Sequence, residues 1–124
     1  MNLLAIDYGT KRIGLAISIK NIITPIDPIK NDSQKFSQIQ KIIDQYQIEK
    51  IYIGISEGDF AIITKDFIKE LKKMVICSIE TVEEAVSTIE ANQIFITNKN
   101  KKKNYKNLID SISAAVILRR ANTY

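Results

Sequence analysis

Acidic residues at three separated places in the chain are the strongest candidates for a catalytic or metal-binding site. Asp7 directly follows four apolar residues, so we expect its carboxylate at the carboxyl end of a central strand, where α/β folds place their sites. Asp110 lies on an amphipathic segment and is the only acidic residue of the lysine-rich carboxyl-terminal region. The third place holds Glu80, Glu83 and Glu84, and spacing does not choose among them. Taken alone, each of these residues could also be structural, since aspartate is favoured in turns and glutamate on surfaces.

Three carboxylates near one point would repel one another unless a cation lay between them. Oxygen ligands with open coordination positions suit Mg²⁺ or Mn²⁺, ions that can activate water and stabilise the departing oxygen in phosphodiester hydrolysis. The chain has no histidine and a single cysteine, Cys77. This composition excludes Ser-His and Cys-His nucleophile systems, the usual zinc sites and an internal disulfide. A divalent cation held by carboxylates is therefore the chemistry that the composition favours.

Positive charge is concentrated at the carboxyl end of the chain. Residues 99–124 contain seven basic residues and one acidic residue, whereas residues 1–98 contain 11 basic and 13 acidic residues. A run of charge is ordinarily a solvated loop, but its position just before Asp110 favours contact with the phosphate backbone of a nucleic acid. Such contacts do not read sequence and weaken steeply with salt. The lysines that we expect to make them are Lys99, Lys101, Lys102, Lys103 and Lys106.

The amino-terminal third of the chain predicts an antiparallel sheet. Residues 3–6 form a short apolar run, which the turn-forming residues 7–10 end. Residues 12–18 then continue with alternating apolar residues, a pattern typical of a hairpin. A third strand is expected around residues 22–26, closed by Pro25 and Pro28.

The next segments alternate between helix and strand, an order that indicates parallel strand pairing. A helix is expected from Asp32 or Ser33, either of which could be its N-cap. Its apolar face would be Phe36, Ile39, Ile42, Ile43 and Tyr46. Residues 50–55 form an isoleucine-rich strand, and a further strand should begin near Val75. The helix between these strands would bury Phe60, Ile63, Phe67 and Leu71.

The remaining elements are helical. Residues 87–95 predict a third helix, and residues 97–104 have no apolar member and predict a solvated loop. The last helix is expected over residues 105–121, with Ala114 and Ala115 permitting close approach to the sheet.

The size of the chain limits what it can contain. Its 124 residues, 45% of them hydrophobic, suffice for one domain, which we expect to span residues 1–124. No apolar run approaches the roughly 20 residues of a membrane-spanning helix. The amino terminus lacks the pattern of a secretory signal, so we expect a cytoplasmic protein with no membrane partner.

Residues 4–16, Leu-Ala-Ile-Asp-Tyr-Gly-Thr-Lys-Arg-Ile-Gly-Leu-Ala, resemble the opening signature of the YqgF/RuvX family. Residues 83–91 resemble its Asp-Glu-Arg-Leu-Ser-Thr-Val-Glu-Ala block, and residues 101–115 resemble its basic run, acidic residue and double alanine. Members of this family are small ribonuclease H-like proteins, described as Holliday junction resolvases and as nucleases that process the 5′ end of pre-16S ribosomal RNA.

The resemblance implies a fold, a cofactor and a set of site residues. The fold is ribonuclease H-like α/β, with a mixed five-stranded sheet whose first three strands are antiparallel and the rest parallel, flanked by helices. The catalytic and metal-binding residues fall on Asp7, Glu84 and Asp110, with Mg²⁺ or Mn²⁺ as cofactor. Arg12 corresponds to the arginine of the first motif and is expected to contact nucleic acid. An alternative alignment would make Glu80 the middle ligand.

Three functions remain open at this point. The first is a metal-dependent nuclease for structured pre-rRNA, and the second is a Holliday junction resolvase acting on branched DNA. The third is an inactive nucleic-acid-binding adaptor, because Ala85 replaces the family's arginine and the loop at residues 55–59 is shortened. The Asp-Xaa-Gly-Thr sequence also opens the phosphate-binding segment of actin-like ATPases, but these need a second lobe, for which 124 residues and four glycines leave no room. The sequence does not distinguish a monomer from a homodimer.

Overall fold

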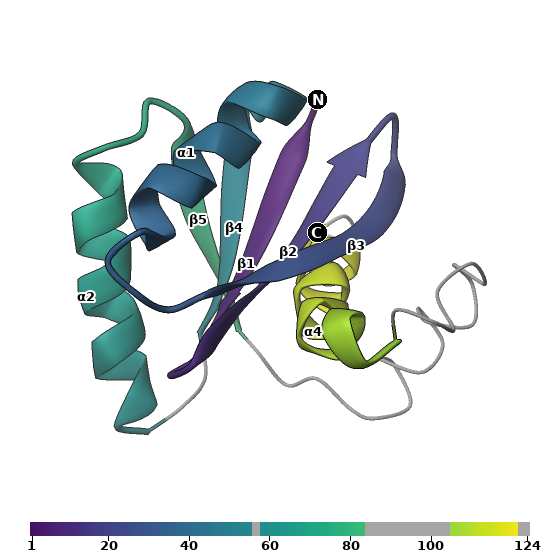
Figure 1. Cartoon of the computed structure of the whole chain (residues 1–124). Helices are drawn as coiled ribbons and strands as arrows, with labels where there is room; N and C mark the ends of the chain where they lie inside the picture. The colour runs from purple at the N-terminus through teal and green to yellow at the C-terminus, as the bar shows by residue number, and fades with distance from the viewer. Residues whose placement is uncertain (56–57, 84–104, 122–124) are drawn as a thin grey trace.

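A five-stranded mixed sheet forms the centre of the molecule (Figure 1). The computed structural model describes residues 1–55, 58–83 and 105–121, and for residues 105–110 the backbone alone. The strands are β1 (Leu3–Tyr8), β2 (Arg12–Ile19), β3 (Ile22–Lys30), β4 (Lys50–Ile55) and β5 (Ser78–Glu83). The helices are α1 (Lys35–Tyr46), α2 (Phe60–Lys72) and α4 (Tyr105–Ala121).

The strand order is β3-β2-β1-β4-β5. Strand β1 pairs antiparallel with β2, which pairs antiparallel with β3. On its other side β1 pairs parallel with β4, and β4 pairs parallel with β5. The predicted mixed sheet is therefore confirmed, and the bounds predicted for β4 and α4 are those observed.

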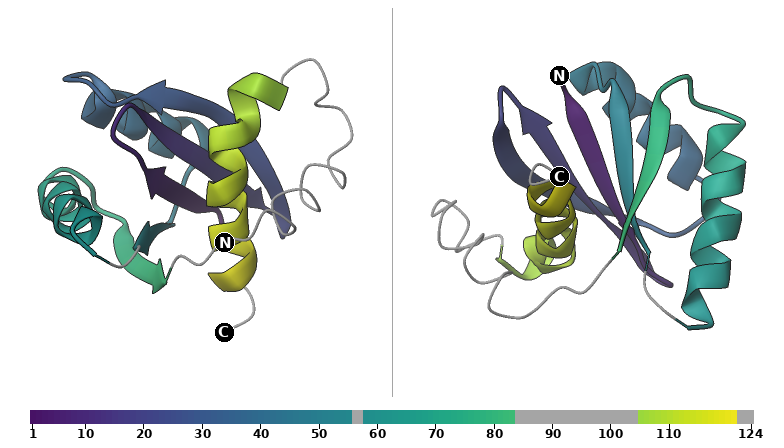
Figure 2. Two further views of the ribbon diagram at one scale, coloured as in Figure 1. Left: turned by 90° about the horizontal axis from the view of Figure 1, so that it is seen from below. Right: turned by 180° about the vertical axis from the view of Figure 1, so that it is seen from behind.

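Helices cover both faces of the sheet, because each strand presents alternate side chains to opposite sides. Helices α1 and α2 lie on one face and α4 crosses the other (Figure 2). We call these the α1/α2 face and the α4 face. Strand β1 sends Leu4 and Ile6 into the core of the α1/α2 face, and Leu3 and Ala5 into that of the α4 face. Ala114 and Ala115 are fully buried there, as their small size predicted.

The third strand is longer than predicted, because neither proline ends it. Strand β3 continues to Lys30. It lies at the edge of the sheet, where one side of the strand needs no N–H donor, so proline is tolerated. Pro25 is buried opposite Ala16, and Pro28 lies where the pairing with β2 shifts register between Ile13 and Leu15.

The prediction for the start of α1 is wrong. Gln34 occupies the N-cap position and no side chain caps the helix. Asp32 instead accepts a hydrogen bond from the Gln34 N–H at 2.9 Å, which makes a turn before the helix.

The predictions for α2 and β5 also need correction. In α2, Ile63 is 48% exposed, whereas Thr64 and Ile68 are buried with Phe67 and Leu71. The buried face is thus turned toward Thr64 and Ile68, because packing against the sheet, rather than apolar spacing alone, fixes the helix phase. Strand β5 begins at Ser78, not near Val75.

The predicted helix at residues 87–95 and the predicted loop at residues 97–104 lie outside the described residues. Within the described part of the chain, no helix is long and apolar enough to cross a membrane.

Candidate active site

Asp7 lies near the carboxyl end of β1 and is half-buried. Alternation along the strand gives it the α4 face, which it shares with Leu3 and Ala5. Asp7 pairs with Gly14 on β2. On β4, Ile53 pairs with Ile6, so the next residue, Gly54, is level with Asp7. Glycine has no side chain, so neither neighbouring strand fills the space beside the Asp7 carboxylate.

Aromatic packing on the opposite face holds this end of β1. The ring of Tyr8 stacks on Phe67 of α2 with a centroid distance of 4.2 Å, and Phe60 lies 6.2 Å away. Such ring pairs stabilise by about 0.5–1.5 kcal/mol beyond the area they bury. The strand end that carries Asp7 is therefore fixed against α2.

Hydrogen bonds from Asn31, the residue after β3, hold the turn that follows Asp7. Asn31 donates from Nδ2 to the Gly9 carbonyl at 2.8 Å and from its backbone N–H to the Lys11 carbonyl at 2.9 Å. A Cβ atom on Gly9 would collide with the Arg12 carbonyl oxygen, which explains the glycine. Arg12 is exposed and, by alternation with Gly14, belongs to the α4 face with Asp7.

One buried hydrogen bond anchors α4 over this region. The Leu15 backbone N–H donates to Ser111 Oγ at 3.1 Å, and Ser111 is fully buried. Leu15 follows the register shift between β2 and β3 and pairs with Ile6, the residue before Asp7. Adjacent Cα atoms lie about 3.8 Å apart. Asp110 is therefore the residue next to Ser111, which bonds to β2, the strand that pairs with β1 at Asp7.

We expect Ser111→Ala to destabilise the protein, because the Leu15 N–H would lose a buried acceptor. An unsatisfied buried donor costs about 1–3 kcal/mol. The free energy of unfolding from urea titration should fall by that amount, while Ser113→Ala, at a half-buried position two residues on, should change it by less than about 0.5 kcal/mol. Equal losses in the two variants would contradict the anchoring role.

The two described candidates for the middle carboxylate do not lie beside Asp7. Glu80 is on the α4 face but pairs with Tyr52, the partner of Ala5, and so lies two residues short of Asp7. It forms an ion pair with Lys50 at 3.1 Å, and this hydrogen bond raises the pKa of Lys50.

Glu83 belongs to the other face. It lies two residues after Thr81, which lines a groove with α2, so alternation turns it away from Asp7.

The structure thus brings Asp7, Arg12 and the backbone of α4 at Asp110 to one end of the sheet. Glu84 and the lysines at positions 99–103 lie outside the described residues, and of Lys106 only the backbone in α4 is described. Among the described side chains, no three acidic or cysteine residues gather as a metal site. The predicted ligand set therefore stays a prediction.

Sequence reasoning did not identify Ser111, Gly14, Gly54 or Asn31 as residues that shape this region. The only local signal for Ser111 was a hydroxyl residue within a largely apolar helix.

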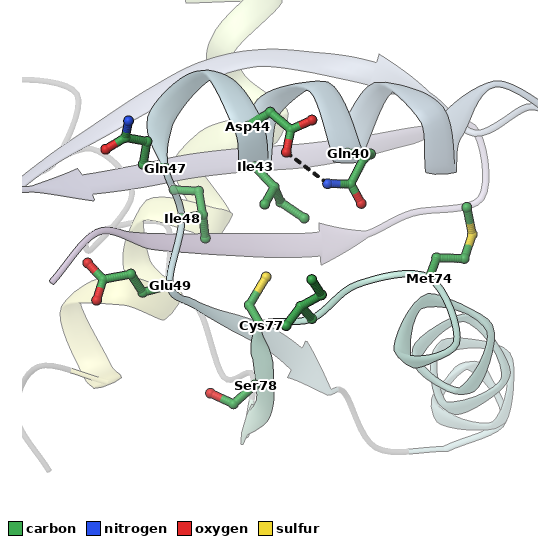
Figure 3. Close-up of a pocket in the computed structure, with 10 residues that line it drawn as sticks. Gln40, Ile43, Asp44, Gln47, Ile48, Glu49, Met74, Cys77 and Ser78 are labelled. Carbon is green, nitrogen blue, oxygen red and sulfur yellow. Dashed lines mark hydrogen bonds between the residues drawn. The ribbon is translucent and has the colours of Figure 1, made fainter.

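The cavity drawn in Figure 3, of about 680 Å³, is not part of this site. Its lining includes Ile48 and Cys77, which precede β4 and β5, so it opens at the opposite end of these strands from Asp7. Asp44 in its wall accepts a hydrogen bond from Gln40 at 3.0 Å. Burial raises the pKa of the Cys77 thiol, so this cysteine is not an activated nucleophile.

Solved structures of two resolvases have the same fold. RuvC of Thermus thermophilus superposes with a TM-score of 0.63 at 10% identity, over 99% of this chain and 98% of that one. The Fowlpox virus resolvase, solved with its substrate Holliday junction DNA, superposes with a TM-score of 0.61 at 14% identity over all of both chains. Together with the sheet order, these likenesses confirm the predicted ribonuclease H-like fold.

Sequence relatives extend over most of the chain. A protein of a Sulfurihydrogenibium species, described as a candidate pre-16S rRNA nuclease, is 38% identical over 94% of this chain and 86% of its own. A Halothermothrix orenii protein with the same description is 33% identical over 95% of this chain and 91% of its own. The family model for RuvX, described as Holliday junction resolvase, matches residues 1–121. The chain therefore belongs to the RuvX family, as the motif around Asp7 predicted.

Proposed function

We propose that the protein is a metal-dependent nuclease that hydrolyses phosphodiester bonds and processes the 5′ end of pre-16S rRNA as one domain over residues 1–124. The observation that carries the proposal is the Ser111–Leu15 hydrogen bond, because it holds the helix that contains Asp110 against the strand beside Asp7. Family membership and relatives described as candidate pre-16S rRNA nucleases support the reaction and the substrate.

The residues of the site suit a hard divalent cation. Asp7, Glu84 and Asp110 would supply carboxylate oxygens, the ligands that Mg²⁺ and Mn²⁺ prefer. The residues opposite Asp7 on β2 and β4 are glycines, which place no side chain beside its carboxylate. A bound Mg²⁺ or Mn²⁺ ion would supply an activated water and stabilisation of the departing oxygen.

The basic residues of the chain would bind and orient the substrate. Arg12 shares the face of Asp7 and would contact a phosphate close to the scissile bond. The lysine run before Asp110, at positions 99–106, would hold the backbone farther away by charge alone. Neither contact reads bases, so the shape of the substrate would decide where cleavage occurs.

A second candidate function is Holliday junction resolution. It is favoured by the description of the family model and by the likeness to resolvases, one of which was solved with junction DNA. Both candidates use the same carboxylate site and differ in the nucleic acid that the basic surface accepts.

The test compares cleavage of two labelled substrates by the purified protein. One is an RNA spanning the mature 5′ end of 16S rRNA with its precursor segment, and the other is a four-way DNA junction. We expect cleavage of the RNA in Mg²⁺ and none with excess EDTA, because phosphodiester hydrolysis at this site needs the cation. Cleavage of the junction alone would favour the resolvase. Tight binding of either substrate without any cleavage would contradict the nuclease and indicate an adaptor.

A further inference from the structure

A second basic surface lies on the α1/α2 face, away from the residues assigned so far. A groove of about 380 Å³ is lined by residues of α2, β4 and β5. Strand β5 is the edge strand of the described sheet, on the side where α2 lies (Figure 1). Its apolar lining comes from Ile55 and Ile68, and none of its lining residues within 1–55, 58–83 and 111–121 is acidic. The remaining lining residues are Lys65, Lys69, Lys72 and Thr81.

The three lysines form a row of like charge along one side of α2. Positions i, i+4 and i+7 are neighbours on a helix, and like charges at such spacings destabilise it. Of the acidic residues of this helix, Glu70 lies about 100° around the axis from Lys69, whereas Asp66 is three positions before Lys69 and is its neighbour on the helix surface. Within the described part of the chain none of the three lysines forms an ion pair, whereas the neighbouring Lys73 pairs with Glu70 at 3.3 Å.

The groove begins at the same end of the sheet as Asp7. Gly54 is level with Asp7 on the neighbouring strand. Ile55 follows Gly54, and Thr81 pairs with Ile53, the residue before it. From there the lysine row extends along α2 for about 10 Å, since seven residues of helix rise about 1.5 Å each. A nucleic acid strand leaving the site around the edge at β5 would meet these ammonium groups in succession.

We propose that this groove binds the phosphodiester backbone of the substrate segment that flanks the scissile bond. The phosphates supply the negative charge that the lysine row lacks within the described chain, and the apolar lining accepts sugars without reading sequence. The contact is separate from the one proposed for residues 99–106. The inference rests on the proposed function only in requiring a nucleic acid substrate.

The test is a salt titration of binding with two charge-matched triple variants. One is K65Q/K69Q/K72Q in the groove, and the control is K20Q/K41Q/K73Q at exposed lysines outside it. Glutamine removes the charge and is a good helix former at positions 41, 65, 69 and 72, and Lys20 and Lys73 are exposed residues outside the helices. Both variants should therefore unfold thermally near the wild type. Binding is measured by fluorescence anisotropy with the precursor RNA in an Asp7→Asn background, which prevents cleavage.

We expect the groove variant to bind about tenfold more weakly at low salt than the control. Its slope of log affinity against log salt should be shallower by about 2, because each phosphate contact to a single strand contributes about 0.7. Equal affinities and slopes in the two variants would overturn the groove proposal. If wild type cleaves the RNA and the groove variant matches the control, the groove proposal fails alone. If the wild type neither binds nor cleaves, the proposed function fails and the groove proposal fails with it.

Discussion

Asp7→Asn should abolish Mg²⁺-dependent cleavage while leaving nucleic acid binding intact. Asparagine keeps the size of the side chain and one oxygen but removes the charge that would attract the cation. A catalytic metal supplies several kcal/mol of transition-state stabilisation, so we expect a loss in kcat of about 10³-fold or more. Binding should not weaken, because the substitution removes a negative charge that would repel the phosphates of the nucleic acid. Single-turnover cleavage and anisotropy, measured on the same preparation, separate the two effects.

A matched control is Asp44→Asn, an exposed aspartate on α1. It makes the same chemical change beside the cavity at the opposite end of the strands from Asp7, and its cleavage rate should stay within about twofold of wild type. If Asp7→Asn lost binding and cleavage equally, or cleaved at the wild-type rate, Asp7 would not be a metal ligand in catalysis.

The local signals in the sequence were sufficient for most of the fold. The turn residues after Asp7 indicated the hairpin, and the apolar spacing of residues 105–121 indicated α4 with its observed bounds. These features depend on neighbours within a few positions, which is what periodicity and turn chemistry record. The parallel portion of the sheet followed from the alternation of strands and helices, since parallel strands need a crossover between them.

Two of the wrong predictions concern features that distant partners decide. Pro28 is tolerated within β3 because that strand lies at the edge, and strand position in a sheet is not visible locally. Ile63 matched the apolar spacing of α2, but the sheet buries Thr64, whose hydroxyl donates to the Phe60 carbonyl within the helix at 3.1 Å. Such a bond lets a polar residue take a core position.

The same reason limits what the sequence could predict of the site. Asp7 was identified because a carboxylate directly after an apolar strand is a local pattern. The hydrogen bond between Ser111 and Leu15 joins residues 96 positions apart. Leu15 also lies directly after the register shift between β2 and β3. No spacing rule connects these residues. The sequence therefore predicted which acidic residues to consider. The packing of α4 supports the proposal that Asp7 and Asp110 share one site.

The middle carboxylate can be assigned by comparing Glu84→Gln with Glu80→Gln. Glu80 pairs with Lys50 at the level of Ala5, and Glu83 belongs to the opposite face from Asp7, so neither described glutamate is placed to share a cation with Asp7. We therefore propose Glu84 as the ligand and expect Glu84→Gln to lose activity as severely as Asp7→Asn, by about 10³-fold.

Glu80→Gln should leave the cleavage rate within about twofold, because it breaks only a partly exposed ion pair, and pairs at the surface contribute about 0–1 kcal/mol to stability. Cleavage rates across a Mg²⁺ titration distinguish the variants, since losing a ligand also raises the Mg²⁺ concentration needed for half-maximal activity, whereas losing a surface ion pair does not. The reverse outcome, with Glu80→Gln inactive and Glu84→Gln active, would establish the alternative alignment. In that case Glu80 would have to exchange Lys50 for the cation, and Lys50→Met should then leave activity intact.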